Sequence, residues 1–255
     1  MTEHTSKKPV EKIKDAAQQA VKAETTSPPK REYRTFLFRA ALVSAIGAFA
    51  LLTLMVATIP SFAIDLQITR TLQSINSPLF AELMRLISWS GFSPQSYIIS
   101  ALIVLVIYSF GWKWEALTAL VAALLPPLVN ILVKELIRRP RPTMDLVHVF
   151  RILDSYSFPS GHVMFYVGFF GFIWFLVFTL LKRSLIRTLL LTFLGSLIVL
   201  VGISRIYLGQ HWASDVLGAY LLGSIMLVGI IQFYRWGKKR FFIHQPVVPH
   251  NSASR

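Results

Sequence analysis

Six apolar runs limit what this chain can fold into more than any other feature. They cover approximately residues 40–59, 96–110, 116–133, 163–181, 189–203 and 216–233. A helix needs about 20 apolar residues to cross the hydrocarbon core of a bilayer, and the second run approaches that length when it is extended back to Pro94. The pattern predicts an all-α membrane protein with six transmembrane helices.

The composition agrees with this prediction. Apolar residue types make up 54% of the chain and charged types 15%, with a mean hydropathy of +0.57, whereas soluble domains carry about 25% charged residues. This balance excludes a disordered protein and argues against an ordinary soluble enzyme. The absence of cysteine excludes disulfides, thiolate metal sites and cysteine nucleophiles.

The polar ends of the chain divide it into three parts. Residues 1–34 form a basic cytoplasmic tail that we expect to be partly disordered. A weak helical spacing from Val10 to Val21 leaves a short helix on the membrane surface as the alternative. Residues 35–237 form the six-helix transmembrane domain, and residues 238–255 form a second basic cytoplasmic tail. The first apolar run and the basic region before it are too long for a cleaved signal peptide.

Lysine and arginine in short loops predict the orientation. The chain carries 26 Lys and Arg against 12 Asp and Glu, a net charge of +14. The basic residues of both tails and of residues 182–187 fall on one side, which we assign to the cytoplasm, by default that of a bacterial inner membrane. The segment 61–93 falls on the other side and suits two interfacial helices. Because the basic residues stand between long apolar runs, we expect membrane lipids and no nucleic acid as partners.

One basic cluster opposes this orientation. Residues 134–151 place five cations on the non-cytoplasmic side: Lys134, Arg138, Arg139, Arg141 and Arg151. An anionic ligand at the outer membrane surface is the simplest reason for this charge. Arg138 and Arg139 are interpreted as interfacial cations whose long side chains extend toward water, with no role in the site.

Three polar segments at the ends of spans carry the candidate chemistry: KELIRRPRP at 134–142, YSFPSGH at 156–162 and SRIYLGQHWASD at 204–215. Counting spans places all three on the non-cytoplasmic side. In the third segment, His211 and Asp215 share one helical face, so the carboxylate can accept the Nδ1 proton and leave Nε2 as a nucleophile or base. An interfacial salt bridge is the alternative interpretation of this pair.

The other two segments suit an anion. Ser160 and Gly161 precede a helix that begins near His162, and the free N–H groups of a helix start bind anions. Lys134 and Arg141 add positive charge, and guanidinium groups match phosphate oxygens. A plain turn and interfacial cations are the alternatives for each segment alone. Because the seven acidic residues after residue 34 are scattered, we expect these cations to neutralise charge, with no metal and no cofactor.

Two prolines lie inside the third apolar run. Pro126 and Pro127 should bend or break the helix there. Asn130, one turn later, is predicted to bond the carbonyl groups that the prolines leave free.

Together the strings resemble the three-part signature of the type 2 phosphatidic acid phosphatase superfamily. The matches are K-x6-R-P from Lys134, P-S-G-H from Pro159 and S-R-x5-H-x3-D from Ser204, all complete and in order within about residues 40–235. The resemblance implies that His211 is a nucleophile that forms a phosphohistidine, that Asp215 orients it and that His162 protonates the leaving group. It also implies a metal-free reaction and a set of residues that bind the phosphoryl oxygens: Lys134, Arg141, Ser160, Gly161 and Arg205.

The resemblance implies an integral membrane lipid phosphatase whose site lies at the outer, periplasmic face. Undecaprenyl diphosphate, phosphatidate and phosphatidylglycerol phosphate are the candidate substrates. A phosphotransferase of the same fold, with a second lipid or sugar as acceptor, is the alternative, and an inactive lipid-binding or transport protein is a remote one. Four aromatic residues are candidates to line a groove for the lipid tails: Phe158, Phe165, Tyr166 and Phe169.

Overall fold

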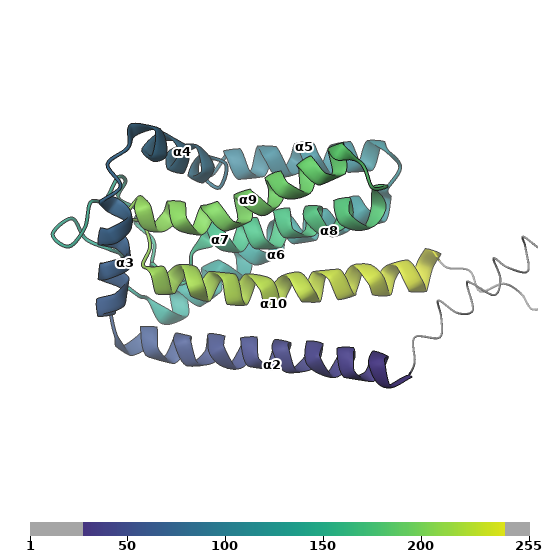
Figure 1. Ribbon diagram of the computed structural model, residues 1–255, viewed down its shortest axis with the longest axis horizontal. Coiled ribbons are helices and arrows are strands. Elements are labelled where there is room, and N and C mark those ends of the chain that lie inside the picture. The colour runs from purple at the N-terminus through teal and green to yellow at the C-terminus, as the bar shows by residue number, and fades with distance from the viewer. Residues whose placement is uncertain (1–27, 243–255) are drawn as a thin grey trace, which may run out of the picture. The chain divides into compact units, whose positions relative to one another are not determined.

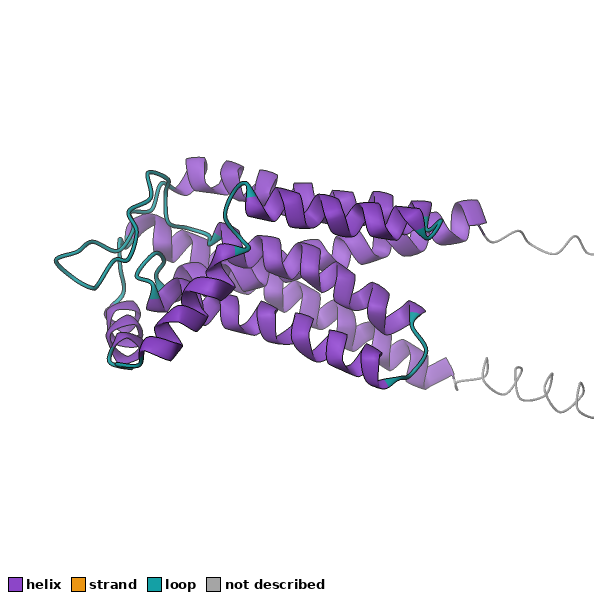
Figure 2. Ribbon diagram, turned by 90° about the horizontal axis from the view of Figure 1, so that it is seen from above, coloured by secondary structure: helices purple, strands orange, loops and turns teal. Residues whose placement is uncertain are grey.

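The computed structural model describes residues 28–242, and every regular element in that range is a helix (Figures 1 and 2). In chain order these are α2 (Pro28–Thr58), α3 (Ala63–Gln73), α4 (Pro78–Trp89), α5 (Gln95–Ser109), α6 (Lys113–Ile137), α7 (Gly161–Phe165), η1 (Tyr166–Phe170), α8 (Gly171–Leu180), α9 (Leu185–Tyr207), α10 (Ala213–Gly237) and η2 (Lys238–Phe242). The all-α expectation is confirmed for this range. The alternative surface helix near the N-terminus lies outside the described residues.

Five stretches of the described chain are long and apolar enough to cross a bilayer: Glu32–Thr58, Lys113–Ile137, Gly161–Leu180, Leu185–Tyr207 and Ala213–Phe241. The third of them combines α7, η1 and α8. The apolar helix α5 has 15 residues, which is short for a spanning helix. Helices suited to a membrane are present as expected, and a count of six, with α5 as the second span, stays a prediction.

The chain divides into two compact units, Met1–Ser44 and Ala45–Arg255, and the division falls inside α2. This helix begins at Pro28, because proline is tolerated in the first turn, where a backbone N–H has no intrahelical acceptor. Helix α2 therefore extends into the region expected to be a tail. The domain boundaries predicted after residues 34 and 237 stay predictions.

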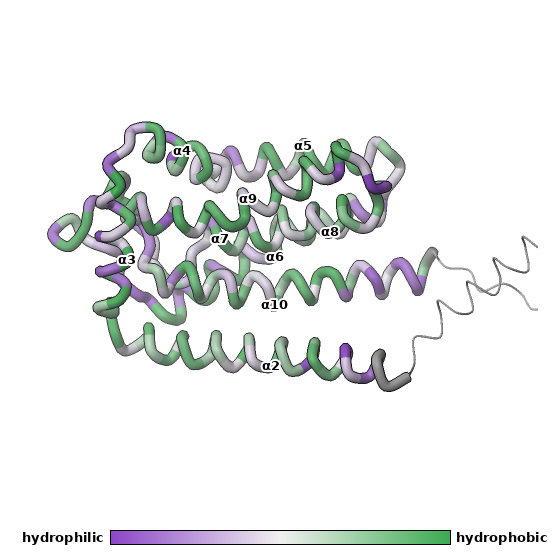
Figure 3. Tube along the Cα trace, in the orientation of Figure 1, coloured by the Kyte–Doolittle hydropathy of each residue, from purple (hydrophilic) through white to green (hydrophobic). Residues whose placement is uncertain are grey.

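Within the second unit, α5, α6, α8, α9 and α10 run alongside one another (Figures 1 and 2), and α3 lies across the ends of α9 and α10. Helix α5 packs on α6, α4 on α9, and α10 on α6 and α7. Hydrophilic residues concentrate near α3 with its neighbouring loops and at the opposite ends of the long helices (Figure 3). Two short helices, α3 and α4, form in the segment 61–93, as expected.

Helix α6 packs closely on its neighbours and supports the site. It buries four small residues, Ala116, Ala119, Ala122 and Ala123, and small residues let membrane helices approach closely. Pro126 and Pro127 lie within α6 and do not break it. Asn130 donates to the Pro159 carbonyl at 2.9 Å and to the Met164 sulfur at 3.3 Å. The expectation that Asn130 satisfies carbonyls of its own helix is therefore wrong, because its amide reaches across to the second polar segment.

Two glycines of α10 provide a matched test of this close packing. A Cβ atom at Gly223 would lie 3.1 Å from Val167 Cβ and 3.6 Å from Met164 Cα, whereas at Gly229 it would meet nothing within 4 Å. We expect Gly223→Leu to destabilise the protein by about 1–3 kcal/mol through overpacking, and Gly229→Leu to change stability little. Thermal unfolding of both variants in one detergent measures the difference, and equal midpoints would contradict the packing.

Candidate active site

The three polar segments meet around a cavity of about 270 Å³. Six of the eight predicted site residues line it: Lys134, Arg141, Gly161, His162, Arg205 and His211. The other two, Ser160 and Asp215, are fully buried and contact residues of the cavity wall. The fold thus gathers residues from the end of α6, the start of α7, the end of α9 and the start of α10.

A tight turn between α9 and α10 presents His211 to the cavity. Gly209 has a φ of 64°, which is strained for residues with a Cβ atom, and a Cβ there would overlap the backbone of His148. The N–H of Gln210 donates to the Arg205 carbonyl at 3.1 Å and closes the turn. Glycine at this position therefore allows the chain to deliver His211 just before α10 begins.

The His211 ring lies between a guanidinium and a carboxylate, in a residue that is 1% exposed. Arg141 Nη1 is 3.2 Å from Nε2, and Asp215 Oδ2 is 3.5 Å from Nδ1. Because a guanidinium can only donate, Nε2 is the accepting nitrogen and the ring proton sits on Nδ1, toward the carboxylate. At 3.5 Å this last contact is an ion-pair distance and longer than a strong hydrogen bond.

Burial and neighbouring cations set the charge state of these groups. Burial lowers the pKa of His211 well below its usual range, and repulsion from Arg141, Lys134 and Arg205 lowers it further. Burial also lowers the pKa of Arg141 to about 10, while the charge of Asp215 acts in the opposite direction. At neutral pH His211 is therefore uncharged and Arg141 is charged.

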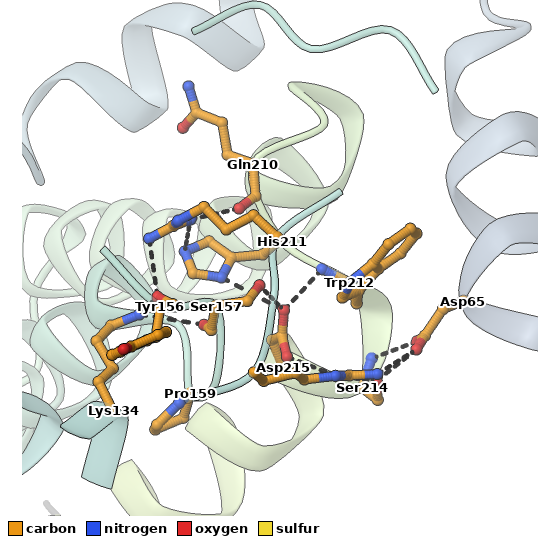
Figure 4. Close-up of polar contacts among 12 residues, drawn as sticks. Asp65, Lys134, Tyr156, Ser157, Pro159, Gln210, His211, Trp212, Ser214 and Asp215 are labelled. Atoms are coloured by element: carbon orange, nitrogen blue, oxygen red, sulfur yellow. Dashed lines mark hydrogen bonds and ion pairs between the residues drawn. The ribbon is translucent and has the colours of Figure 1, made fainter. Parts of the chain in front are cut away.

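Hydrogen bonds from three directions fix Asp215. Its Oδ2 accepts from the Trp212 N–H at 2.8 Å and from the Ser157 hydroxyl, and its Oδ1 accepts from Arg139 Nη1 at 2.6 Å (Figure 4). The carboxylate is held against the His211 ring as a result.

The structure corrects the interpretation of Arg139, which is 1% exposed and does not extend toward water. Its Nη2 lies 2.9 Å from Asp65 Oδ2 and its Nη1 lies 2.6 Å from Asp215 Oδ1, so one guanidinium bridges two buried carboxylates. Ser214 joins them, because its N–H and its hydroxyl donate to Asp65 at 2.8 and 2.7 Å. Arg138 is exposed, as a surface cation would be.

Sequence reasoning missed the residues that support Asp215. The position of Asp65 could have indicated a buried ion pair, since an acidic residue shortly after an apolar span requires a partner or water. Ser157 stood inside a segment already singled out, two residues before the proline of its motif. Nothing in the sequence indicated that α3 would bring Asp65 to Arg139.

The second polar segment places a helix start at the cavity. Ser160 is the N-cap of α7 and Gly161 its first residue, and a Cβ at Gly161 would lie 2.9 Å from Asn130 Oδ1. The His162 ring stands edge-on to Phe92, with 4.4 Å between ring centres. Its Nε2 is buried and has no hydrogen-bond partner within the described chain, so this nitrogen is available to a ligand.

Several buried polar atoms lack partners where an anion would sit. Arg205 is fully buried, and its Nη1 donates to Ser88 Oγ at 2.5 Å, while Nε and Nη2 find no acceptor among residues 28–242. The hydroxyl of Ser160 is likewise buried and unpaired in this range. Buried donors without acceptors cost about 1–3 kcal/mol each, so a ligand that brings acceptor oxygens is favoured here.

Backbone carbonyls of the loop before α7 and of the turn before α10 orient the other two cations. Lys134 Nζ donates to the carbonyls of Tyr156 and Ser157. Arg141 donates through Nε to Ser155 at 2.6 Å and through Nη1 to the Gln210 carbonyl at 2.5 Å. These bonds hold both cations at the cavity without neutralising them.

One wall of the cavity is apolar. Helices α5 and α6 contribute Tyr97, Pro127 and Ile131. Of the four aromatic residues expected to line a tail groove, Phe165 lines the cavity, whereas the other three are fully buried in the core. That expectation is wrong for those three, and residues 91–93 before α5 form a part of the wall that sequence reasoning missed.

The charge that faces the cavity is positive. Within the described chain, no three His, Asp or Glu side chains are grouped so that they could hold a metal ion. The fully buried acids Asp65 and Asp215 are both paired with Arg139. The arrangement is thus suited to binding an anion and to attacking it through a neutral imidazole.

Known proteins share this sequence pattern and fold. The sequence model of the PAP2 superfamily matches residues 115–239. Phosphatidylglycerophosphatase B of Bacillus subtilis (strain 168) is 34% identical over 181 residues, which are 69% of this chain and 86% of that protein. The crystal structure of the first transmembrane PAP2 type phosphatidylglycerolphosphate phosphatase from Bacillus subtilis matches with a TM-score of 0.68 and 30% identity, covering 78% of this chain and 98% of that one.

A more distant structure shows the same fold. Aquifex aeolicus LpxE matches with a TM-score of 0.54 and 21% identity, over 68% of this chain and 98% of that one. The resemblance inferred from the three motifs is confirmed. This chain belongs to the PAP2 superfamily, and it is an integral membrane phosphatase, a phosphoric monoester hydrolase that acts on lipid phosphates.

Proposed function

We propose that the enzyme hydrolyses the terminal phosphate monoester of phosphatidylglycerol phosphate. The observation that carries the proposed chemistry is His211, whose Nε2 faces a cation-lined cavity while Asp215 contacts its Nδ1. The names of the Bacillus subtilis relatives support this choice of lipid. The cavity, with cations on one side and an apolar wall on the other, suits a substrate with a phosphate head and acyl tails.

In the first proposed step, Nε2 of neutral His211 attacks the phosphorus atom, and the bond from phosphorus to the glycerol oxygen breaks. His162 gives its proton to that oxygen, so phosphatidylglycerol leaves as an alcohol and the phosphoryl group remains on His211 as a phosphohistidine. Asp215 stabilises the positive charge that develops on the ring.

In the second proposed step, water attacks the phosphohistidine, His162 accepts the proton of the water, and the bond from phosphorus to nitrogen breaks. Inorganic phosphate leaves, and both histidines return to their starting states. Throughout, the phosphoryl oxygens bind the groups named in the motifs: Lys134, Arg141, Ser160, Gly161 and Arg205. These fixed donors supply the charge stabilisation that phosphoryl transfer requires, without a metal ion.

We place the site at the outer face of a bacterial inner membrane, with both termini in the cytoplasm. The positive-inside distribution of the tails and of residues 182–187 supports this orientation. The apolar wall from α5 and α6 supports access from the surrounding lipid, since acyl chains can stay in an apolar environment while the head reaches His211.

Phosphate release in detergent with excess EDTA tests the proposal. We expect the wild-type protein to release phosphate from phosphatidylglycerol phosphate faster than from phosphatidate or undecaprenyl diphosphate. His211→Ala should lower the rate by at least about 10³-fold, because the nucleophile is lost, and should keep the wild-type unfolding midpoint.

Full turnover by this variant would disprove the role of His211 as the nucleophile, and inactivity of the wild type in EDTA would disprove metal independence. A folded wild type that releases no phosphate, but forms a phosphorylated acceptor when an acceptor lipid is added, would be a phosphotransferase.

The pH dependence follows from the lowered pKa of His211. The nucleophile must be neutral, and an unperturbed histidine becomes half protonated at about pH 6.5. The folded protein holds this pKa well below that value. We therefore expect that protonation of His211 does not lower kcat/KM as the pH falls from 8 to 6.5. The decrease in kcat/KM that this protonation causes should begin only below pH 6.5. A comparison of two substrates whose phosphate groups differ in pKa distinguishes ionisation of the enzyme from ionisation of the substrate. A decrease in kcat/KM that begins at or above pH 6.5 on the acid side with both substrates would contradict the expectation.

We propose Arg139 as the positioning residue for Asp215. Arg139→Met would leave Asp65 and Asp215 buried without a counter-charge, and breaking a buried ion pair costs about 3–5 kcal/mol. We expect a lower unfolding midpoint and a loss of kcat. Adding Asp65→Asn to this variant removes one uncompensated charge and should restore part of the stability without the activity. An unfolding midpoint unchanged by Arg139→Met would refute the bridge.

A further inference from the structure

A second cavity of about 190 Å³ lies beside the first. Arg141 and Leu153 line both cavities. The rest of the wall comes from the loop between α6 and α7 and from Gly209 and Gln210 in the turn before His211. The reaction proposed above does not use this cavity, so its polar groups require a separate explanation.

Arg151 supplies this cavity with a cation that none of the three motifs contains. Its guanidinium carbon lies 4.8 Å from the centre of the Phe92 ring, and that of Arg205 lies 5.2 Å from the same centre. The two cations are therefore no farther apart than the sum of these distances. Arg151 is exposed, and no carboxylate of residues 28–242 forms an ion pair with it. A phosphate bound at Arg151 would therefore also be attracted by the charge of Arg205, which lines the first cavity.

Gln210 adds a buried hydrogen-bond acceptor to the same cavity. The residue is 3% exposed, and its Oε1 has no donor within the described chain. Its side chain points away from the contacts that join His211 to Asp215 (Figure 4). Because a buried acceptor without a donor is unfavourable, Gln210 suits a ligand that brings a hydroxyl group.

We infer that the second cavity is a second phosphate subsite. Arg151 binds a phosphate group other than the one under attack, Gln210 accepts a hydrogen bond from a hydroxyl next to it, and Arg141 lies between the two phosphates. Two sources of phosphate have this chemistry. The headgroup of phosphatidylglycerol phosphate carries a phosphodiester and a hydroxyl one glycerol unit from the reacting monoester, and this case rests on the proposed substrate. Released inorganic phosphate, which carries its own hydroxyl when protonated, is the other source.

Kinetics of the full-length protein in detergent distinguish these sources. The measurements are kcat and KM for phosphatidylglycerol phosphate and for phosphatidate with the same acyl chains, and the inhibition constant of inorganic phosphate. The variants are Arg151→Gln, Arg151→Lys and the control Arg138→Gln. Arg138 is an exposed arginine near the start of the same loop whose Nε donates to the Glu135 carbonyl, and its substitution should leave all values unchanged.

If the phosphodiester binds the subsite, Arg151→Gln raises KM for phosphatidylglycerol phosphate about five- to tenfold and leaves kcat and the KM for phosphatidate within about twofold. Arg151→Lys keeps the charge and should restore most of the affinity. If released phosphate binds there, its inhibition constant rises by a similar factor with either lipid, and both KM values stay constant.

Unchanged KM values together with an unchanged inhibition constant in Arg151→Gln would overturn the subsite. An equal rise of KM for both lipids would overturn it as well, since phosphatidate has no second phosphate. Hydrolysis of phosphatidate but not of phosphatidylglycerol phosphate by the wild type would overturn the proposed substrate instead, and the inhibition constant measured with phosphatidate would then decide the subsite.

Discussion

The buried ion pairs of Arg139 hold together the end of the molecule that contains the cavity. One arginine joins Asp65 of α3 to Asp215 of α10 through its side chain, and its carbonyl accepts from the Ser157 N–H in the loop before α7. Charges buried in this way are costly to desolvate and persist where the geometry is good and the polar atoms are bonded. The orientation of His211 depends on this arrangement, because Asp215 cannot rotate without breaking it.

The charge that faces the cavity is positive, in contrast to the paired charges around Arg139. Lys134 and Arg141 bond backbone carbonyls, and Arg205 leaves two buried nitrogens without acceptors in the described chain. Donors that are fixed before the substrate arrives need no reorganisation when charge develops on the phosphoryl oxygens. Burial lowers the pKa of His211, and the same cations lower it further, so the ring stays neutral. The charges that attract a phosphate thus also favour the neutral form of the nucleophile.

Local spacing predicted the helices and the six motif residues that line the cavity, because apolar runs and short motifs carry that information within a few turns. The same reasoning failed for Arg139. Its partner Asp65 lies 74 positions away in the sequence. Without the position of α3, a cation near the end of a span can equally be an exposed side chain or a buried ion-pair partner. Asn130 failed for a related reason, since its bond to Pro159 depends on how α6 packs against α7.

The burial of His211 bears on whether such an enzyme hydrolyses or transfers. The residue is 1% exposed, so in the proposed reaction the phosphohistidine meets water only through the cavities that adjoin it. The apolar wall of α5 and α6 favours departure of the lipid alcohol into the membrane, and Arg141 lines both cavities. An acceptor lipid would have to occupy the place the first lipid left, whereas a water molecule is small enough to enter the cavity without doing so. The smaller size of water as the acceptor therefore favours hydrolysis over transfer.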